Sequence, residues 1–193
     1  MKKTMLLAGI ASVMIFSNAA DAAEKVQLVS QKSALNSAGI LRVANPAHRK
    51  LMEFLPNGGA EGGCYKVTQN AESRHATVVY WIKDSLMNIT NTAAPLVMKL
   101  QVKGKGSFRL SFLCYNKAGR YFSPEINKTF RNTDTKGAWQ TVEFVFTPSP
   151  KNARYLAEVA SVTPAVCVES GEFLIDNWEA EVKNPAPGIK LED

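Results

Sequence analysis

The sequence predicts an all-β protein, built as an antiparallel β-sandwich or barrel. Apolar and polar residues alternate over short segments, which is the period of a strand with one buried face. Clusters of glycine, asparagine and proline separate these segments, as expected for strands that follow one another through turns. No apolar pattern at helical spacing extends over three turns, so helical crossovers are not expected. We therefore expect two antiparallel sheets that face each other across an apolar core.

The predicted strands cover residues 26–29, 40–43, 76–82, 95–102, 107–115, 140–146, 155–162 and 172–182. Segment 76–82 is rich in β-branched and aromatic residues, which strands prefer. The clearest alternation lies in 95–102, 107–115 and 140–146. The apolar residues on the expected inner side of these three strands are Leu96, Met98, Leu100, Val102, Phe108, Leu110, Phe112, Cys114, Val142, Phe144 and Phe146.

Glycine, asparagine and proline mark the ends of several predicted strands. Residues 104–106 (GKG) predict a hairpin between the two strands that flank them. Residues 116–119 (NKAG) predict a turn. Pro148 and Pro150 are expected to end the strand before them, because proline has no backbone N–H to donate.

The first 22 residues are predicted to be a bacterial-type signal peptide, cleaved after Ala22. Lys2 and Lys3 precede an apolar run over residues 5–16. A membrane anchor is the alternative, but the run is too short, because spanning a bilayer takes about 20 apolar residues. No later segment is long and apolar enough to span a membrane. We therefore expect a periplasmic or secreted protein with no membrane span after cleavage.

The rest of the chain is expected to form one domain, since its length suffices for a single well-buried core. Residues 23–53 are weakly patterned and are predicted to be an N-terminal extension or the first strands that lead into the sandwich. Residues 54–183 are predicted to form the sandwich, and residues 184–193 a polar tail.

Charge and cysteine usage narrow the possible partners. The chain carries a formal net charge of +6 without a run of five or more basic residues, so a nucleic-acid partner is not expected. Cys64, Cys114 and Cys167 allow at most one disulfide in an exported protein and leave one free thiol. Their pairing stays open, although alternation places Cys114 on the apolar side of its strand.

Catalytic chemistry has little support in the sequence. His48 and His75 are the only histidines, and neither lies in a nucleophile motif of the kind that a catalytic triad needs. No phosphate-binding loop and no HExxH zinc motif is present. Glycoside hydrolysis takes two carboxylates about 5 to 10 Å apart, and the acidic residues Glu143, Glu158 and Asp176 fall on different predicted strands. We therefore predict that the protein is not an enzyme.

Several segments resemble, in order and spacing, the carbohydrate-binding modules that have a galactose-binding-like jelly-roll fold. They are 55–62 (LPNGGAEG), 97–103 with 107–112, 137–148 (GAWQTVEFVFTP) and 173–180 (FLIDNWEA). The resemblance implies an antiparallel two-sheet β-sandwich of the jelly-roll, galactose-binding-like type, and a carbohydrate ligand. Ala60 departs from the family pattern, which has a large apolar residue there, and residues 23–53 lie outside the resemblance.

The resemblance also implies a structural calcium ion, with Glu61 and Asp176 among its ligands. Calcium takes six to eight oxygen ligands, which include backbone carbonyls. The glycine-rich turn around Glu61 is suited to turning carbonyls inward. The alternative is that both acids accept backbone hydrogen bonds and so tie the first strand of the sandwich to the last.

The predicted ligand contacts are Trp81, Gln101, Arg109, Tyr115 and Tyr121. Sugar recognition uses an aromatic face against the C–H side of the ring, with amide, carboxylate or guanidinium groups bonded to the hydroxyls. Alternation places Gln101 and Arg109 on the non-core side of their strands, and the two tyrosines flank the turn 116–119. By the same resemblance, Trp139 and Trp178 are expected to lie in the core.

Three functions are compatible with this sequence. The first is an exported, non-catalytic carbohydrate-binding module that recognises a polysaccharide or glycan through a sheet face or a loop rim. The second is a structural or assembly protein of the cell envelope that binds another protein through the face or an open edge of the sandwich. The third is a small hydrolase of the same fold. The fold by itself does not choose among them.

Overall fold

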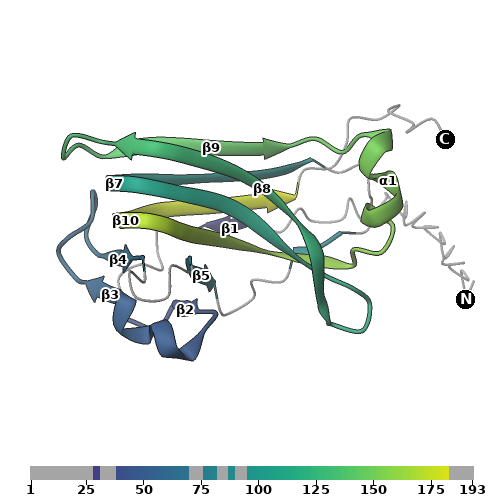
Figure 1. Cartoon of the computed structure of the whole chain (residues 1–193), viewed down its shortest axis with the longest axis horizontal. Coiled ribbons are helices and arrows are strands. Elements are labelled where there is room, and N and C mark those ends of the chain that lie inside the picture. The colour runs from purple at the N-terminus through teal and green to yellow at the C-terminus, as the bar shows by residue number, and fades with distance from the viewer. Residues whose placement is uncertain (1–27, 31–37, 70–75, 82–86, 90–94, 183–193) are drawn as a thin grey trace, which may run out of the picture.

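The computed structural model describes residues 28–30, 38–69, 76–81, 87–89 and 95–182 (Figure 1). The strands are β1 (Leu28–Ser30), β2 (Leu41–Val43), β3 (Met52–Leu55), β4 (Cys64–Thr68), β5 (Thr77–Trp81), β6 (Met87–Asn88), β7 (Leu96–Tyr115), β8 (Tyr121–Asp134), β9 (Gln140–Phe146) and β10 (Ser161–Val182). Two short helical segments are η1 (Pro46–Leu51) and α1 (Pro150–Leu156). The predicted signal peptide, the tail 184–193 and His75 lie outside the described residues. Within the described ranges no helix is long and apolar enough to cross a membrane.

Strands β7 and β10 form the centre of the sheet. They run antiparallel from the pair Leu96–Val182 to the pair Tyr115–Ser161. The other edge of β7 pairs first with β9 and then with β8. The other edge of β10 pairs with β1, β4, β5 and β6, and β3 and β2 extend the sheet beyond β4 and β5. Every pairing is antiparallel, which confirms the predicted fold class.

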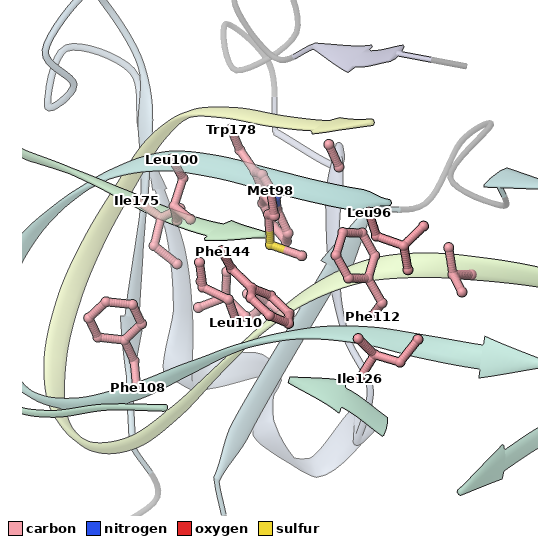
Figure 2. Packing of buried hydrophobic residues seen from close by; sticks show 14 of the residues in the cluster. Leu96, Met98, Leu100, Phe108, Leu110, Phe112, Ile126, Phe144, Ile175 and Trp178 are labelled. Carbon is pink, nitrogen blue, oxygen red and sulfur yellow. The ribbon is translucent and has the colours of Figure 1, made fainter. Parts of the chain in front are cut away.

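The central pair bends where glycines of the two strands meet. A Cβ atom at Gly106 would overlap the carbonyl oxygen of Ser170, and one at Gly171 would overlap that of Lys105. Only glycine permits two backbones to approach so closely. Figure 2 shows β10 curling around one end of the apolar cluster, so that its halves lie on opposite sides of the core. The same two strands therefore contribute to both layers of the sandwich.

The core lies between these two layers. The apolar residues predicted on the inner side of β7 and β9 all belong to the core cluster or pack against it. Phe112, in the second half of β7, lies 5.9 Å from Phe144 of β9, measured between ring centroids, although β9 pairs with the first half of β7. Near the bend, the rings of Phe108 and Phe173 are 4.9 Å apart. These contacts join the two layers.

The hairpin predicted at residues 104–106 is wrong. β7 continues through these residues, and its partner there is β10. Gly104 and Gly106 therefore serve a close approach between two long strands and not a reversal of the chain. The turn predicted at residues 116–119 is confirmed, because the Gly119 N–H donates to the Asn116 carbonyl oxygen at 2.9 Å.

The strand predicted over residues 155–162 is wrong in its first part, because α1 ends at Leu156 and β10 begins at Ser161. Local contacts favour the helix. The Ser149 N–H and hydroxyl both donate to Asn152 Oδ1, at 2.6 and 2.8 Å, and Pro150 is the first helical residue. This is the arrangement of a capped helix start.

Strands β3, β4, β6 and β8 are not among the predicted strands. In β8, Ile126 is 3% exposed in the core and Phe130 packs against the cluster, four residues apart on one side of the strand. The three cysteines are buried free thiols, so the chain contains no disulfide. Cys114 lies in the core, as the alternation predicts.

Gly171→Ala is expected to destabilise the protein by about 3–5 kcal/mol, because the added Cβ would strike the Lys105 carbonyl at a φ of +75°. Gly119→Ala is the matched control. Its φ is +70° and nothing lies within 4 Å of an added Cβ, so only backbone strain of about 1–2 kcal/mol remains. Urea unfolding measures both losses. Equal losses of unfolding free energy in the two variants would contradict the close approach of the two backbones at Gly171.

Candidate ligand-binding site

A bulge in β10 gives three consecutive residues three different surroundings. The pairing with β7 shifts register between Asp176 and Glu179, and Asn177 has a left-handed φ of +45°. Asp176 is 3% exposed, and Trp178 is 1% exposed in the core (Figure 2). Asn177 stays half-buried at the surface. Bulges commonly redirect a side chain in this way, and asparagine tolerates the left-handed region better than most residues.

Asn177 and Gln101 form an amide pair on the outer face of the sheet. Asn177 Nδ2 donates to Gln101 Oε1 at 3.0 Å. Gln101 lies on β7 opposite Thr141 of β9, on the non-core side that the alternation predicts. The bond uses neither Gln101 Nε2 nor Asn177 Oδ1. The pair therefore presents a donor and an acceptor in a fixed relation to each other.

A depression of about 210 Å³ opens beside the amide pair, and we call it the polar depression. Its lining residues are Glu61, Lys99, Leu100, Gln101, Thr141, Asn177 and Glu179. They come from the turn between β3 and β4 and from β7, β9 and β10. Lys99 Nζ lies 3.1 Å from Glu143 Oε1 of β9, which holds the lysine across the face of the sheet.

The polar depression brings amide, hydroxyl, ammonium and carboxylate groups onto one small surface. Such a mixture can donate to and accept from the several hydroxyls of a sugar. None of the lining residues among those described is aromatic, so hydrogen bonds and not ring stacking would hold a ligand here. The volume is below the roughly 300–1,000 Å³ of pockets for drug-sized molecules, which suits one unit of a longer chain.

Asp176 ties the last strand of the sandwich to the turn before β4. Its Oδ2 accepts the Ala60 N–H at 2.7 Å, and its Oδ1 accepts the Asn177 N–H at 2.7 Å. The sequence left two roles open for Asp176: binding calcium, or accepting backbone hydrogen bonds that tie the first strand of the sandwich to the last. These two bonds are of the second kind. Ala60 is exposed and takes part through its backbone.

The Asp176 carboxylate also belongs to a cradle of oxygen atoms around Gly59. A Cβ at Gly59 would touch Asp176 Oδ2 and the carbonyl oxygens of Gly62 and Gly63. Calcium binds carboxylate and carbonyl oxygens, so the donor chemistry of the cradle fits this ion. Glu61 is exposed and lines the polar depression. Within the described part of the chain, no group of three or more histidine, cysteine, aspartate or glutamate side chains gathers as a metal site.

Cys64 lies at the start of β4, close to this cradle. Burial, and then the charge of Asp176, raises the pKa of the Cys64 thiol to about 11, whereas Lys103 acts in the opposite direction. The thiol is therefore protonated at neutral pH and is not an activated nucleophile.

Arg109 lies past the bend from Gln101, on the side of β7 opposite the core residues Phe108 and Leu110, where its neighbour Ser111 is buried. It pairs in register with Cys167 of β10 and Thr129 of β8. Its Nε lies 3.6 Å from Glu169 Oε1. Because the inner faces of the two layers share one core, their outer faces point away from each other. Arg109 and Gln101 therefore do not belong to one site.

Two of the predicted aromatic ligand contacts, Tyr115 and Tyr121, lie on the same side of the bend as Arg109. Tyr115 and Tyr121 pair across β7 and β8, with ring centroids 6.1 Å apart. Tyr121 is 50% exposed, and burial raises the pKa of Tyr115. Trp81 is the last residue of β5 and pairs with Leu41, but its side chain is outside the described residues.

Trp178 is confirmed as a core residue, whereas the same prediction for Trp139 is wrong. Trp139 is only half-buried and is not part of the core cluster. Trp139 directly precedes β9 and has the same odd-numbered parity as the outward residues Thr141 and Glu143. The alternation of β9, continued by one residue, therefore indicated an outward side chain. Thr141 and Asn177 line the polar depression and are not among the predicted ligand contacts. The alternation of β9 also predicts the outward position of Thr141. Alternation within β10 does not predict that of Asn177, because the bulge shifts the register of β10 and so exchanges the inward and outward positions.

A second depression, of about 410 Å³, lies at the bend, and we call it the bend depression. Its lining residues are Lys103, Gly104, Lys105, Asp134, Gly137, Glu172 and Leu174. On β7 it follows the polar depression directly, since Lys99 and Gln101 line the first and Lys103 and Lys105 the second.

Comparison with known proteins bears on the fold. No protein-family model matches the chain, and no curated protein matches its sequence. Among solved structures, the enzymatically active domain of tailspike protein 4 from bacteriophage CBA120 is similar over 80% of this chain, with a TM-score of 0.51 and 11% identity. This chain spans only 21% of that protein's length. At this identity the similarity concerns the fold alone.

Carbohydrate-binding modules are also among the similar structures. The CBM22-1 xylan-binding domain of Paenibacillus barcinonensis Xyn10C has a TM-score of 0.44 and 10% identity, over 82% of this chain and 87% of its own. TmCBM61, solved in complex with β-1,4-galactotriose, has a TM-score of 0.47 and 10% identity, over 77% and 92%. The fold that the structure itself shows is an antiparallel β-sandwich.

Asp176→Asn is expected to destabilise the protein by about 1–3 kcal/mol, because an amide has only one acceptor oxygen for two N–H groups that now donate to a carboxylate. Glu179→Gln, on the same strand and half-buried, is the control and should cost no more than about 0.5 kcal/mol. Urea unfolding in the presence of a chelator measures both. A loss no larger than that of the control would show that the Asp176 tie does not stabilise the fold.

Proposed function

We propose that this protein is an exported, non-catalytic carbohydrate-binding module. It binds a polysaccharide on the outer face of the layer formed by β9, the first half of β7 and the second half of β10. The observation that carries the proposal is the amide pair of Gln101 and Asn177 beside the polar depression. The resemblance of the sequence to carbohydrate-binding modules supports it. The basic and apolar leader in residues 1–22 supports export.

The backbone of Asn177 supports a role in binding. A non-glycine residue in the left-handed region costs about 1–2 kcal/mol, and such strain persists where neighbouring contacts fix it, often at functional sites. Here the Asp176 bonds and the burial of Trp178 hold the bulge on both sides. The amide is therefore oriented before a ligand arrives, which lowers the entropic cost of binding.

Asn177→Gly is expected to weaken glycan binding about 5- to 20-fold, because it removes one or two hydrogen bonds to the ligand. Glycine adopts a φ of +45° without strain, so the melting temperature should not fall. Gln101→Ala should weaken binding by a similar factor. The ligand is first identified on an array of soluble polysaccharides, and affinities are then measured by calorimetry.

Gln140→Ala is the matched control, because it removes the amide of an exposed β9 residue that does not line the polar depression. Unchanged affinity in both site variants would contradict the proposed face. If no glycan binds and the protein instead self-associates or copurifies with another protein, the envelope-assembly function replaces this proposal. Glu61 and Glu179 both line the depression, so the mixtures are also assayed for reducing ends, whose release would contradict a non-catalytic role.

We also propose a structural calcium ion at the Gly59 cradle, held by the Asp176 carboxylate, the Gly62 and Gly63 carbonyls and Glu61. An ion that binds only the folded state adds stability as RT ln(1 + [L]/Kd). Calcium is therefore expected to raise the melting temperature, chelator to reverse the rise, and Asp176→Asn to abolish it. An unchanged midpoint would leave the hydrogen bonds of Asp176 as its whole role.

A further inference from the structure

The bend depression is built around Lys103. Two hydrogen bonds join Thr135 to Gly104: the Thr135 N–H donates to the Gly104 carbonyl oxygen at 3.1 Å, and the Gly104 N–H donates to Thr135 Oγ1 at 2.9 Å. Gln140 pairs with Val102. The turn between β8 and β9 therefore begins opposite Gly104 and ends opposite Val102, so it passes alongside Lys103.

The two acidic residues of the bend depression are each matched by a cation. Asp134 Oδ2 lies 3.4 Å from Lys105 Nζ. The backbone N–H of Lys136, and then Lys105, hold the pKa of Asp134 below its ordinary value. Glu172 Oε2 lies 3.2 Å from Lys66 Nζ and accepts the Thr68 hydroxyl at 3.1 Å. Both carboxylates are therefore compensated within the protein.

The Lys103 ammonium has no ion-pair or hydrogen-bond partner among the residues that the structure describes. The residue opposite it on β10 is the apolar Leu174, so no acid faces it across the ladder. The buried thiol of Cys64, which is close enough to feel its charge, is neutral. Lys103 is half-buried and brings to the depression a positive charge that no carboxylate of the described residues pairs with directly, although the Asp176 carboxylate acts on the same Cys64 thiol.

Apolar surface adjoins this charge. Leu174, Gly104 and Gly137 line the same depression. Trp139 lies outside the core and directly precedes Gln140, whose partner is Val102, but it does not line the bend depression. Apolar surface next to the Lys103 ammonium suits a sugar ring that carries an anionic group.

We propose that the bend depression binds a carboxylated or sulfated sugar unit, whose anionic group pairs with the Lys103 ammonium, and that the ligand of this protein is therefore an acidic polysaccharide. The inference rests on the proposed function. The polar and bend depressions together follow β7 from Lys99 to Lys105, about 20 Å at 3.3 Å per residue. One extended polysaccharide chain could occupy both.

The test compares anionic polymers with neutral counterparts by affinity electrophoresis of the full secreted chain. The pairs are polygalacturonate with its methyl ester, and dextran sulfate with dextran, which separate carboxylate from sulfate recognition. We expect at least one anionic polymer to bind about tenfold or more tightly than its counterpart. Lys103→Gln should remove about tenfold of that preference, and added salt should reduce it further.

Lys117→Gln is the control for general attraction by a basic protein, because it removes the same charge from an exposed turn at the other end of β7. It should leave the preference unchanged.

Equal binding of acidic and neutral polymers, or equal losses in Lys103→Gln and Lys117→Gln, would overturn the inference while leaving the proposed function intact. Failure of every polymer, including those on the polysaccharide array, would overturn the proposed function itself.

Discussion

The close approach of two backbones at the bend is the constraint on which the rest of the structure depends. Gly106 faces the Ser170 carbonyl and Gly171 faces that of Lys105, without room for a Cβ on either side. Because β7 and β10 stay paired across this point, the same two strands supply the middle of both layers, and Phe112 can meet Phe144 across the core. Both depressions lie on the outer side of the layer that contains β9, the first half of β7 and the second half of β10.

The bulge in β10 divides three neighbouring residues among three tasks. Asp176 accepts two backbone N–H groups, Asn177 carries an amide on the outer face, and Trp178 fills the core. In a regular strand, Asp176 and Trp178 would share one face, and a carboxylate would then point into the core beside the indole. The left-handed backbone at Asn177 removes that conflict. The local strain therefore allows two backbone hydrogen bonds, an outward amide and a buried indole to come from three consecutive residues.

The alternation of apolar and polar residues predicted the inner face of β7 and β9. This pattern repeats every two residues within one strand, so it can be read from the sequence without knowledge of distant contacts. It also placed Gln101 correctly on the outer face. The bend was not predictable in this way, because residues 104–106 resemble a hairpin until their contact with the distant Gly171 is known. Asn177 was missed for a similar reason, since the bulge shifts the register of its strand. Helix α1, in contrast, had a local signal in Ser149, Pro150 and Asn152.

The bend also decides which predicted contacts can act together. Gln101 lies on one outer face, whereas Arg109, Tyr115 and Tyr121 lie on the other, and these faces point apart because their inner sides share a core. A single extended ligand cannot touch both. The face of Gln101 offers two adjoining depressions along β7. One holds the amide pair, and the other holds Lys103, which no carboxylate of the described residues pairs with directly. On the opposite face, Arg109 is already drawn toward Glu169. The continuous path along β7 therefore favours the Gln101 face for a polymer with an anionic unit.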